Sequence, residues 1–338
     1  MIEPKADVVR ATSPLHVSSP AVTPGRLILY GLMITIWGSS FFFTSLALDS
    51  FTPLQIVFIR MLIATAILGA VVLVIRPGLP RRAAVWGHFV FLGILSIALP
   101  YSLLTWAQVW VDSSVAIVLS STTPIFVFLI ATLVLHSETF DATRLVAILI
   151  AFGGVILLTA GNTSASTSWT WSVVIVGTSI VYAIANLYTR HFVGDVHPLL
   201  TAFLQLGFGT LWLLPVMLFT RGWQLPADVR PLSVVALLEL GVLGSAFGYV
   251  LFFHFIRTWG STKTSLNTYL QPVVGITLGV GVLGERPGWP AWVGSAVVLI
   301  GLALFGGSSL RRQLTRHRRQ TRDRAIRRRR VRRPADPA

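Results

Sequence analysis

Long apolar runs alternate with short polar breaks over most of the chain, from residue 27 to residue 307. Each run is roughly 18 to 25 residues long, the length that an α-helix needs to cross a hydrocarbon core of about 30 Å. Hydrophobicity is continuous within each run, whereas the strands of a membrane barrel would alternate between apolar and polar positions. The pattern therefore predicts an all-α membrane protein with ten transmembrane helices, near residues 27–47, 53–75, 83–107, 113–135, 142–160, 169–190, 198–220, 232–256, 261–283 and 289–307.

The composition supports this interpretation. Hydrophobic residues make up 54% of the chain and charged residues 12%, and the mean hydropathy is +0.75. A soluble protein usually contains about a quarter charged residues. The chain has no cysteine, which excludes disulfides, thiolate metal sites and a cysteine nucleophile.

Lysine and arginine residues predict the orientation, because cytoplasmic loops are enriched in both. With the N-terminus in the cytoplasm, the inner segments before the C-terminal tail hold ten of these residues and the outer loops hold three. We therefore expect a multi-pass protein of the cell (inner) membrane with both termini cytoplasmic. Residues 1–26 contain four prolines and few apolar residues, which predicts a disordered cytoplasmic tail.

The C-terminal tail, residues 308–338, is rich in arginine. Residues 311–338 hold 13 arginines against two aspartates, so they carry +11 of the net charge of +15. We expect this tail to lie near anionic lipid headgroups on the cytoplasmic side. It has no interleaved aromatic residues that could stack on bases, so no specific nucleic acid is expected as a partner.

A stretch of the first half of the chain recurs in the second half. Residues 101–138 correspond to residues 249–285, with a tyrosine and a proline 23 positions apart in both copies. Further matches at offsets of 145 to 148 extend the correspondence to two five-helix repeats, residues 27–160 and 161–307. Because five is odd, the second repeat begins on the opposite side of the membrane, so the repeats are inverted. Inverted repeats are typical of secondary transporters, which alternate access around a midplane site.

The matched prolines, Pro124 and Pro272, lie inside the fourth and ninth predicted helices. A proline within a helix lacks one N–H and displaces the carbonyl four residues earlier, which predicts helix bends and free carbonyls at Ser120 and Thr268. In lipid such a carbonyl needs a partner, and a Ser or Thr hydroxyl, a water or a ligand can supply it. We therefore expect the broken backbone to line a cavity.

The sequence predicts that this cavity binds a small-molecule solute between the repeats. Aromatic faces would cover its apolar surface, and amides and hydroxyls would orient its polar groups. The matched aromatic residues fit an interfacial belt almost equally well. Arg60, whose counterpart is the neutral Gln205, fits structural pairing and ligand contact equally well. The candidate residues are Trp37, Phe41, Arg60, Tyr101, Thr105, Ser120, Thr123, Tyr182, Asn186, Tyr249, Asn267 and Gln271.

The sequence offers little for an enzyme. It has no Ser/His/Asp set at a recognisable spacing, no P-loop, no Gly-rich dinucleotide turn and no clustered carboxylates for a metal. We expect neither a cofactor nor a metal. A polytopic membrane enzyme acting on a lipid-soluble substrate stays as the alternative, because His, Glu and Ser residues occur within the spans. The small-residue faces serve either internal packing or a homodimer.

The motifs also resemble those of a known family. They are WGSSFFFTSLA at residues 37–47 followed by FIRMLIA, fourth and ninth helices that contain Pro and end in Glu, and glycine-rich fifth and tenth helices. Over about residues 27–307 the chain is similar to EamA-type members of the drug/metabolite transporter superfamily. This resemblance implies a secondary transporter that exports an amino acid, a metabolite or a drug. The family's Gly-Glu-Arg pattern is kept at residues 284–286 but not at residues 136–139.

Overall fold

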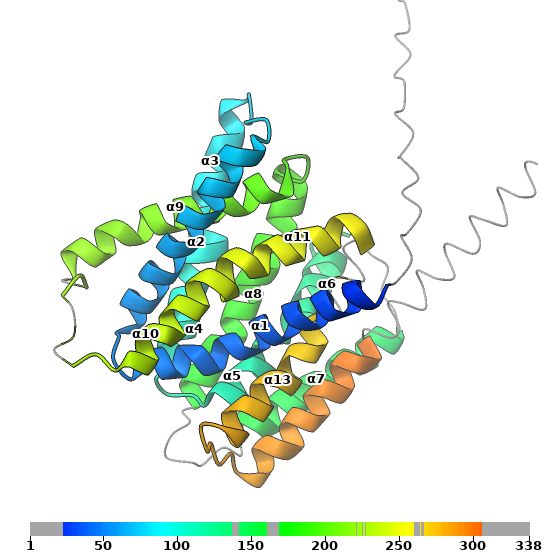
Figure 1. The fold of residues 1–338 in the computed structure, drawn as a ribbon. Helices are drawn as coiled ribbons and strands as arrows, with labels where there is room; N and C mark the ends of the chain where they lie inside the picture. Colours follow the sequence, from blue (N-terminus) through cyan, green and yellow to red (C-terminus); the bar gives the residue numbers. More distant parts are fainter. Residues whose placement is uncertain are drawn as a thin grey trace, which may run out of the picture.

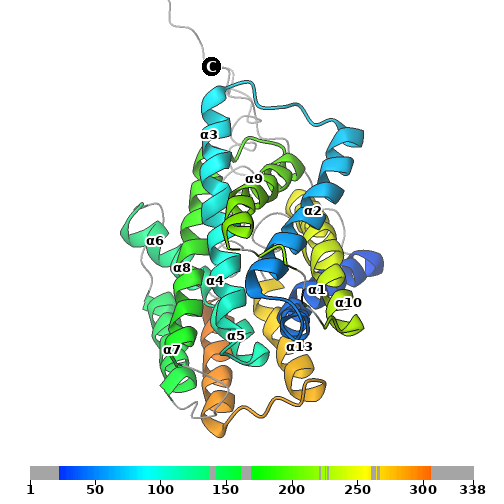
Figure 2. The same ribbon diagram turned by 90° about the vertical axis from the view of Figure 1, so that its left-hand side faces the viewer.

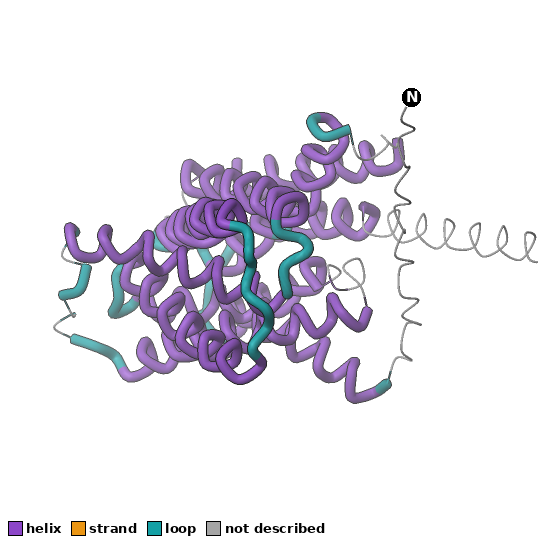
Figure 3. Tube along the Cα trace, turned by 90° about the horizontal axis from the view of Figure 1, so that it is seen from above, coloured by secondary structure: helices purple, strands orange, loops and turns teal. Residues whose placement is uncertain are grey.

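The computed structural model describes residues 23–136, 142–160, 169–220, 222–224, 226, 228–259, 264 and 267–305. All regular structure in these residues is helical, and none of them forms a strand (Figure 3). Seven helical segments of 21 to 25 residues are long and apolar enough to cross a membrane. The prediction of a helical, multi-pass membrane protein is therefore confirmed. Glu138, most of the predicted N-terminal tail and the whole Arg-rich tail lie outside the described residues.

The helices of the first half follow the predicted apolar runs (Figure 1). Proline stands at the first position of α1 and α2, where its missing N–H is not needed for a helical hydrogen bond. Thr52 and Gln55 form a reciprocal capping box at the start of α2. The elements are α1 (Pro24–Leu48), α2 (Pro53–Ile75), α3 (Ala83–Leu92), the π-helix η1 (Gly93–Ala98), α4 (Leu99–Ala107), α5 (Ser113–Ser120), α6 (Thr123–Leu133) and α7 (Ala142–Ala160).

The second half repeats this order. Proline again begins two helices, α9 and α10. The elements are α8 (Trp169–Phe192), α9 (Pro198–Phe219), α10 (Pro231–Glu239), the π-helix η2 (Leu240–Phe247), α11 (Gly248–Trp259) and α13 (Asn267–Gly281). A final apolar helix, Trp289–Phe305, is drawn in orange in Figure 1.

The two π-helical segments were not predicted. They occur at corresponding places in the two halves, η1 between α3 and α4 and η2 between α10 and α11. Each begins where the chain approaches a neighbouring helix closely. A Cβ atom added at Gly93 would lie 2.7 Å from Phe208 on α9, and one at Gly241 would lie 2.9 Å from Ile63 on α2. Glycine at both places therefore permits the close contact.

Contacts between the two halves dominate the packing (Figures 1 and 2). α2 lies against α9 and η2, and α9 also lies against η1. α1 packs on α13, α10 and α11, while α8 packs on α4, α5 and α6. The largest hydrophobic core surrounds α5, with apolar residues of α7, α8 and the final helix packed around it. The helices that carry the candidate site residues thus meet in the interior of the bundle.

Small residues bring α7 and the final helix into close contact (Figure 2). A Cβ atom added at Gly154 would lie 2.6 Å from the backbone nitrogen of Val298. One added at Gly301 would lie 2.6 Å from the backbone nitrogen of Ala151. Backbones approach this closely only where no side chain intervenes, which is how small residues pack membrane helices.

We predict that Gly154→Ala destabilises the protein, because the new Cβ would collide with the backbone of the final helix. Overpacking of this kind costs about 1–3 kcal/mol. Gly153→Ala is the matched control: its Cβ meets no atom within 4 Å, so the change should be neutral or slightly stabilising. Thermal unfolding of both variants in detergent, followed by size-exclusion chromatography, measures the difference. Equal melting temperatures would contradict a packing role for Gly154.

Candidate functional site

Five of the candidate residues come together where helices of the two halves cross. The ring of Tyr101 on α4 lies 6.0 Å from that of Tyr182 on α8, in a T-shaped arrangement. The hydroxyl groups of Tyr182 and Tyr249 both interact with that of Tyr101. The ring of Trp37 on α1 lies 5.9 Å from that of Tyr249 on α11, also edge to face. We call these residues the aromatic–arginine cluster: Trp37, Arg60, Tyr101, Tyr182 and Tyr249.

Arg60 joins the cluster from α2. Its side chain is 6% exposed, so its charge is held inside the protein. Its Nε donates a hydrogen bond of 2.7 Å to Oγ of Ser245 in η2. Its guanidinium carbon lies 4.9 Å from the centre of the Tyr101 ring, within range of a cation–π interaction. The four aromatic side chains of the cluster are half-buried.

The π-helical segment η2 holds two members of the cluster. Nε1 of Trp37 donates a hydrogen bond of 3.0 Å to the carbonyl oxygen of Gly244, next to Ser245, the partner of Arg60. A Cβ atom at Gly248 would overlap the indole nitrogen, so glycine there allows the indole to approach α11. A π-helix shifts the hydrogen-bonding partners of its carbonyls, and such segments frequently mark functional sites.

Asn267 and Gln271 form a second group, on α13. Asn267 is 1% exposed, and its Oδ1 accepts hydrogen bonds from Nε2 of Gln271 at 3.1 Å and from Oγ1 of Thr268 at 3.0 Å. Its Nδ2 lies 3.9 Å from Sδ of Met33 on α1. The two amides therefore bond to each other at the contact between α13 and α1.

The structure interrupts the helix just before Pro124. α5 ends at Ser120 and α6 begins at Thr123. The free carbonyl of Ser120 accepts hydrogen bonds from Oγ1 of Thr123 at 2.9 Å and from Oγ of Ser179 on α8 at 3.4 Å. Hydroxyl groups thus supply the partner that this carbonyl needs in lipid. Pro272, in contrast, lies inside the continuous helix α13.

Three further candidates each lie four residues beyond a member of the cluster: Phe41 on α1, Thr105 on α4 and Asn186 on α8. Phe41 packs against the core around α5, and Thr105 is buried. Asn186 is exposed. The structure thus places Phe41 at the core around α5, Thr105 in the interior, and Asn186 on an exposed surface of the same helix as Tyr182.

Glu239, the last residue of α10, lies close enough to Arg60 for an electrostatic interaction between the two groups. The two side chains form no ion pair. Oε2 of Glu239 is buried, with no hydrogen-bond partner among the described residues. Nowhere in the described part of the chain do three His, Asp or Glu side chains gather where they could hold a metal ion. The cluster itself offers a positive charge, hydroxyl groups and ring faces for recognition.

Glu285 links the segment after α13 to the start of α5. In the sequence it stood out only as part of the Gly-Glu-Arg pattern. This residue follows α13, after Gly284 in the left-handed region (φ 69°). Its Oε1 accepts hydrogen bonds from the backbone nitrogen of Ser113 at 2.8 Å and from its Oγ at 2.6 Å, and Oε2 accepts one from the nitrogen of Ser114 at 3.0 Å. The carboxylate occupies the N-terminus of α5, where free N–H groups and the helix dipole favour negative charge. A residue of the second half thus caps a helix of the first.

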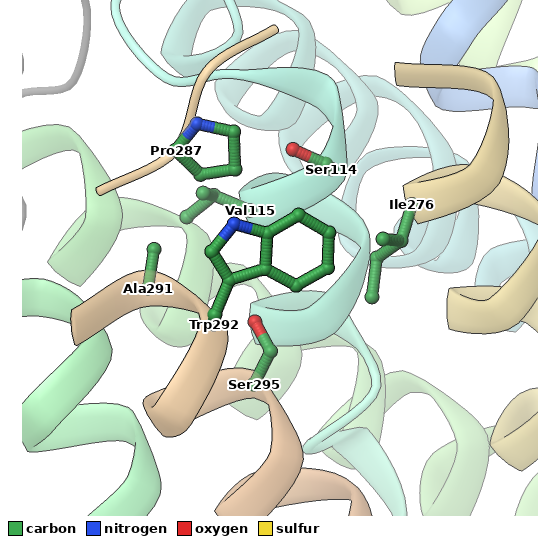
Figure 4. Close-up of a pocket in the computed structure, with 7 residues that line it drawn as sticks. All are labelled: Ser114, Val115, Ile276, Pro287, Ala291, Trp292 and Ser295. Atoms are coloured by element: carbon green, nitrogen blue, oxygen red, sulfur yellow. The ribbon is translucent and has the colours of Figure 1, made fainter. Parts of the chain in front are cut away.

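A small crevice lies beside this cap (Figure 4). It is bounded by the start of α5, by α13, by the loop after Glu285 and by the final helix. The indole of Trp292 lies across it, between Ser114 and Ser295. The crevice contains none of the candidate residues, so it is distinct from the aromatic–arginine cluster. Its lining residues are Ser114, Val115, Ile276, Pro287, Ala291, Trp292 and Ser295.

Comparison with known protein families matches two segments of the chain, residues 26–160 and 169–307, to the EamA-like transporter family. A crystal structure with 16% sequence identity covers 87% of this chain and 99% of its own length, with a TM-score of 0.58. At this identity the likeness concerns the fold alone.

Several curated proteins are similar along most of their length. An uncharacterized transporter of Archaeoglobus fulgidus is 26% identical over 82% of this chain and 96% of its own. An uncharacterized inner membrane transporter of Escherichia coli is 26% identical over 82% and 88%. A protein of Streptantibioticus cattleyicolor named "Probable terminal-alkyne amino-acid exporter" is 25% identical over 84% and 95%.

We predict that Glu285→Gln weakens the contact between α13 and α5. An amide would turn its own N–H groups toward a backbone N–H of α5, and one hydrogen bond left unmade costs about 1–3 kcal/mol. Arg286→Gln, which removes an exposed charge from the next residue, is the control and should leave the melting temperature unchanged. Thermal unfolding of the purified variants compares them. If Glu285→Gln and the parent protein have the same melting temperature, the carboxylate does not stabilise this end of the bundle.

Proposed function

The chain belongs to the EamA-like transporter family, and from this premise we propose that it is a ten-span secondary transporter. It exports a small organic solute by alternating access around a cavity between two inverted five-helix repeats. The printed name of the Streptantibioticus cattleyicolor relative supports an amino acid among the candidate solutes. Both termini lie in the cytoplasm, with the Arg-rich tail near anionic headgroups.

Contacts between corresponding residues support the two-fold relation of the repeats. Oγ1 of Thr65 lies 3.3 Å from Oγ1 of Thr210, and these two residues are related by the offset of 145. A residue can touch its own counterpart only near the axis of a two-fold relation. An axis between α2 and α9 therefore accounts for this contact.

Pairs of contacts away from the axis support the same relation. Gly93 meets Phe208, and their counterparts, Gly241 and Ile63, also meet each other. The contact of Gly154 with Val298 recurs in the same way between α7 and the final helix, as that of Gly301 with Ala151. Seven of the described helices are long and apolar enough to cross a membrane, and Leu145–Leu158 and Trp289–Phe305 are shorter apolar helices. In the proposed topology these nine and α13 form the ten spans.

The aromatic–arginine cluster is the observation that carries the proposed site. Trp37, Arg60 and Tyr101 come from the first repeat, and Tyr182 and Tyr249 from the second. A site shared by both repeats can change its access when one repeat moves against the other. Half-buried rings and hydroxyl groups around one charge suit a small solute with an apolar body and a polar end.

We predict counterflow in proteoliposomes that contain the purified protein. Vesicles loaded with an unlabelled solute should accumulate the labelled form of a solute from the transported class, and the panel includes neutral amino acids, aromatic carboxylates and cationic drugs. Tyr182→Phe removes one hydroxyl group from the cluster and should slow exchange by roughly fivefold, the effect of a lost hydrogen bond of about 1 kcal/mol. Tyr188→Phe, on the same helix, removes a hydroxyl group that bonds to His88 and should leave exchange unchanged.

The two parts of the proposal fail separately in this experiment. If no class of solute exchanges through correctly inserted protein, the chain does not transport members of the panel and the proposed function is wrong. If exchange occurs but Tyr182→Phe and Tyr188→Phe behave alike, the transport function stands and the cluster is not the binding site.

A further inference from the structure

We infer that Arg60 recognises a carboxylate group of the transported solute, so that the cluster selects organic acids, amino acids included, over their uncharged or cationic analogues. The inference rests on the proposed function. It adds the chemical class of the solute and the side chain that recognises it. Its starting point is a buried positive charge that forms no ion pair with any of the described residues.

The partners of Arg60 leave most of its guanidinium group free. The Nε atom donates to Ser245, and one face of the group lies over Tyr101. Arg60 forms no ion pair with any carboxylate among the described residues, Glu239 included. A guanidinium group stays protonated and carries five N–H donors, and the outer edge formed by both Nη atoms matches a carboxylate with two parallel hydrogen bonds.

The backbone of Gly244 passes close to this edge: a Cβ atom placed there would lie 3.5 Å from Nη2 of Arg60, so glycine keeps side-chain atoms away from it. The ring of Tyr101 lies against the guanidinium group, and Tyr182 and Tyr249 are half-buried members of the same cluster. One guanidinium edge flanked by rings fits the single negative charge and the apolar body of an organic acid. A phosphate ester with two negative charges would call for a second cation.

The residue at the corresponding position of the second repeat is neutral, which indicates that packing at this position does not require a positive charge. Gln205, the counterpart of Arg60, lies beside η1 and accepts a hydrogen bond from Ser96 at 3.0 Å. Its Nε2 donates to Thr189 at 3.2 Å. A neutral amide therefore makes the polar contacts at the corresponding place of the first π-helix. The positive charge of Arg60 is an addition to one repeat only.

Glu239 places an acidic side chain near Arg60. The two groups interact through space without forming an ion pair, and Oε2 of Glu239 has no hydrogen-bond partner among the described residues. An amino acid that binds Arg60 through its carboxylate would therefore find an unused acceptor near the same arginine.

Counterflow of L-phenylalanine and L-phenylalaninamide tests the inference, because the two probes differ only in the carboxylate. The parent protein should exchange the acid at least about tenfold faster than the amide, since a site built to bond a polar group discriminates strongly against an analogue that lacks it. Arg60→Gln, which copies the other repeat, should slow exchange of the acid by about tenfold or more and remove the difference between the probes. Arg60→Lys keeps the positive charge but loses the two parallel N–H donors, so it should retain part of the difference in rate between acid and amide.

Arg230→Gln is the matched control, because Arg230 is a largely exposed arginine paired with Asp49 away from the cluster. It should leave both exchange rates unchanged. Equal rates for acid and amide in the parent protein, or an unchanged ratio in a folded Arg60→Gln variant, would overturn the inference while transport itself stands. If neither probe nor any other member of the panel exchanges, the proposed function fails, and the inference fails with it.

Discussion

A polar group buried in lipid needs a partner within the protein, and this constraint accounts for the polar contacts of the described helices. The carbonyl that Pro124 frees at Ser120 is bonded by two hydroxyl groups. The carbonyl of Gly244 in η2 is bonded by an indole, and the amides on α13 bond to each other. The helix break before Pro124 and the π-helical segment η2 therefore occur where side chains can bond to the affected carbonyl groups. The aromatic–arginine cluster lies beside η2. Arg60 stands out because it is a buried cation that forms no ion pair among the described residues.

Packing is repeated in the two halves, whereas charge is not. Thr65 and Thr210 meet each other, and the glycine contacts of η1 recur at η2. Arg60 and Gln205 occupy corresponding positions but differ by a whole positive charge. In a repeated fold, apolar side chains pack closely only where their shapes fit each other. The packing contacts are therefore alike in the two halves. A buried charge in a membrane is costly and is kept mainly where function uses it, which makes the asymmetric position the informative one.

The sequence was sufficient for the features that depend on spacing. It predicted the helical membrane fold, the break at Pro124 and the tyrosines that the structure brings together. It missed η1 and η2, because a π-helix arises from close contacts such as Gly93 with Phe208, which no local pattern encodes. It also missed the cap that Glu285 provides to α5. Periodicity in an apolar run barely constrains how a helix is rotated, so side-chain partners on different helices could not be derived.

The contacts between the halves differ in how readily water can replace them. Glu285 holds α5 through hydrogen bonds to two backbone N–H groups and a hydroxyl at a helix end, and water offers the same groups equivalent partners when the contact opens. At the glycine contacts of α7 with the final helix, backbone packs closely on backbone and on small side chains, and this van der Waals contact is lost if the two helices part. Under alternating access, the polar cap is therefore the contact suited to open and close, and the glycine-packed pair is suited to move as one body.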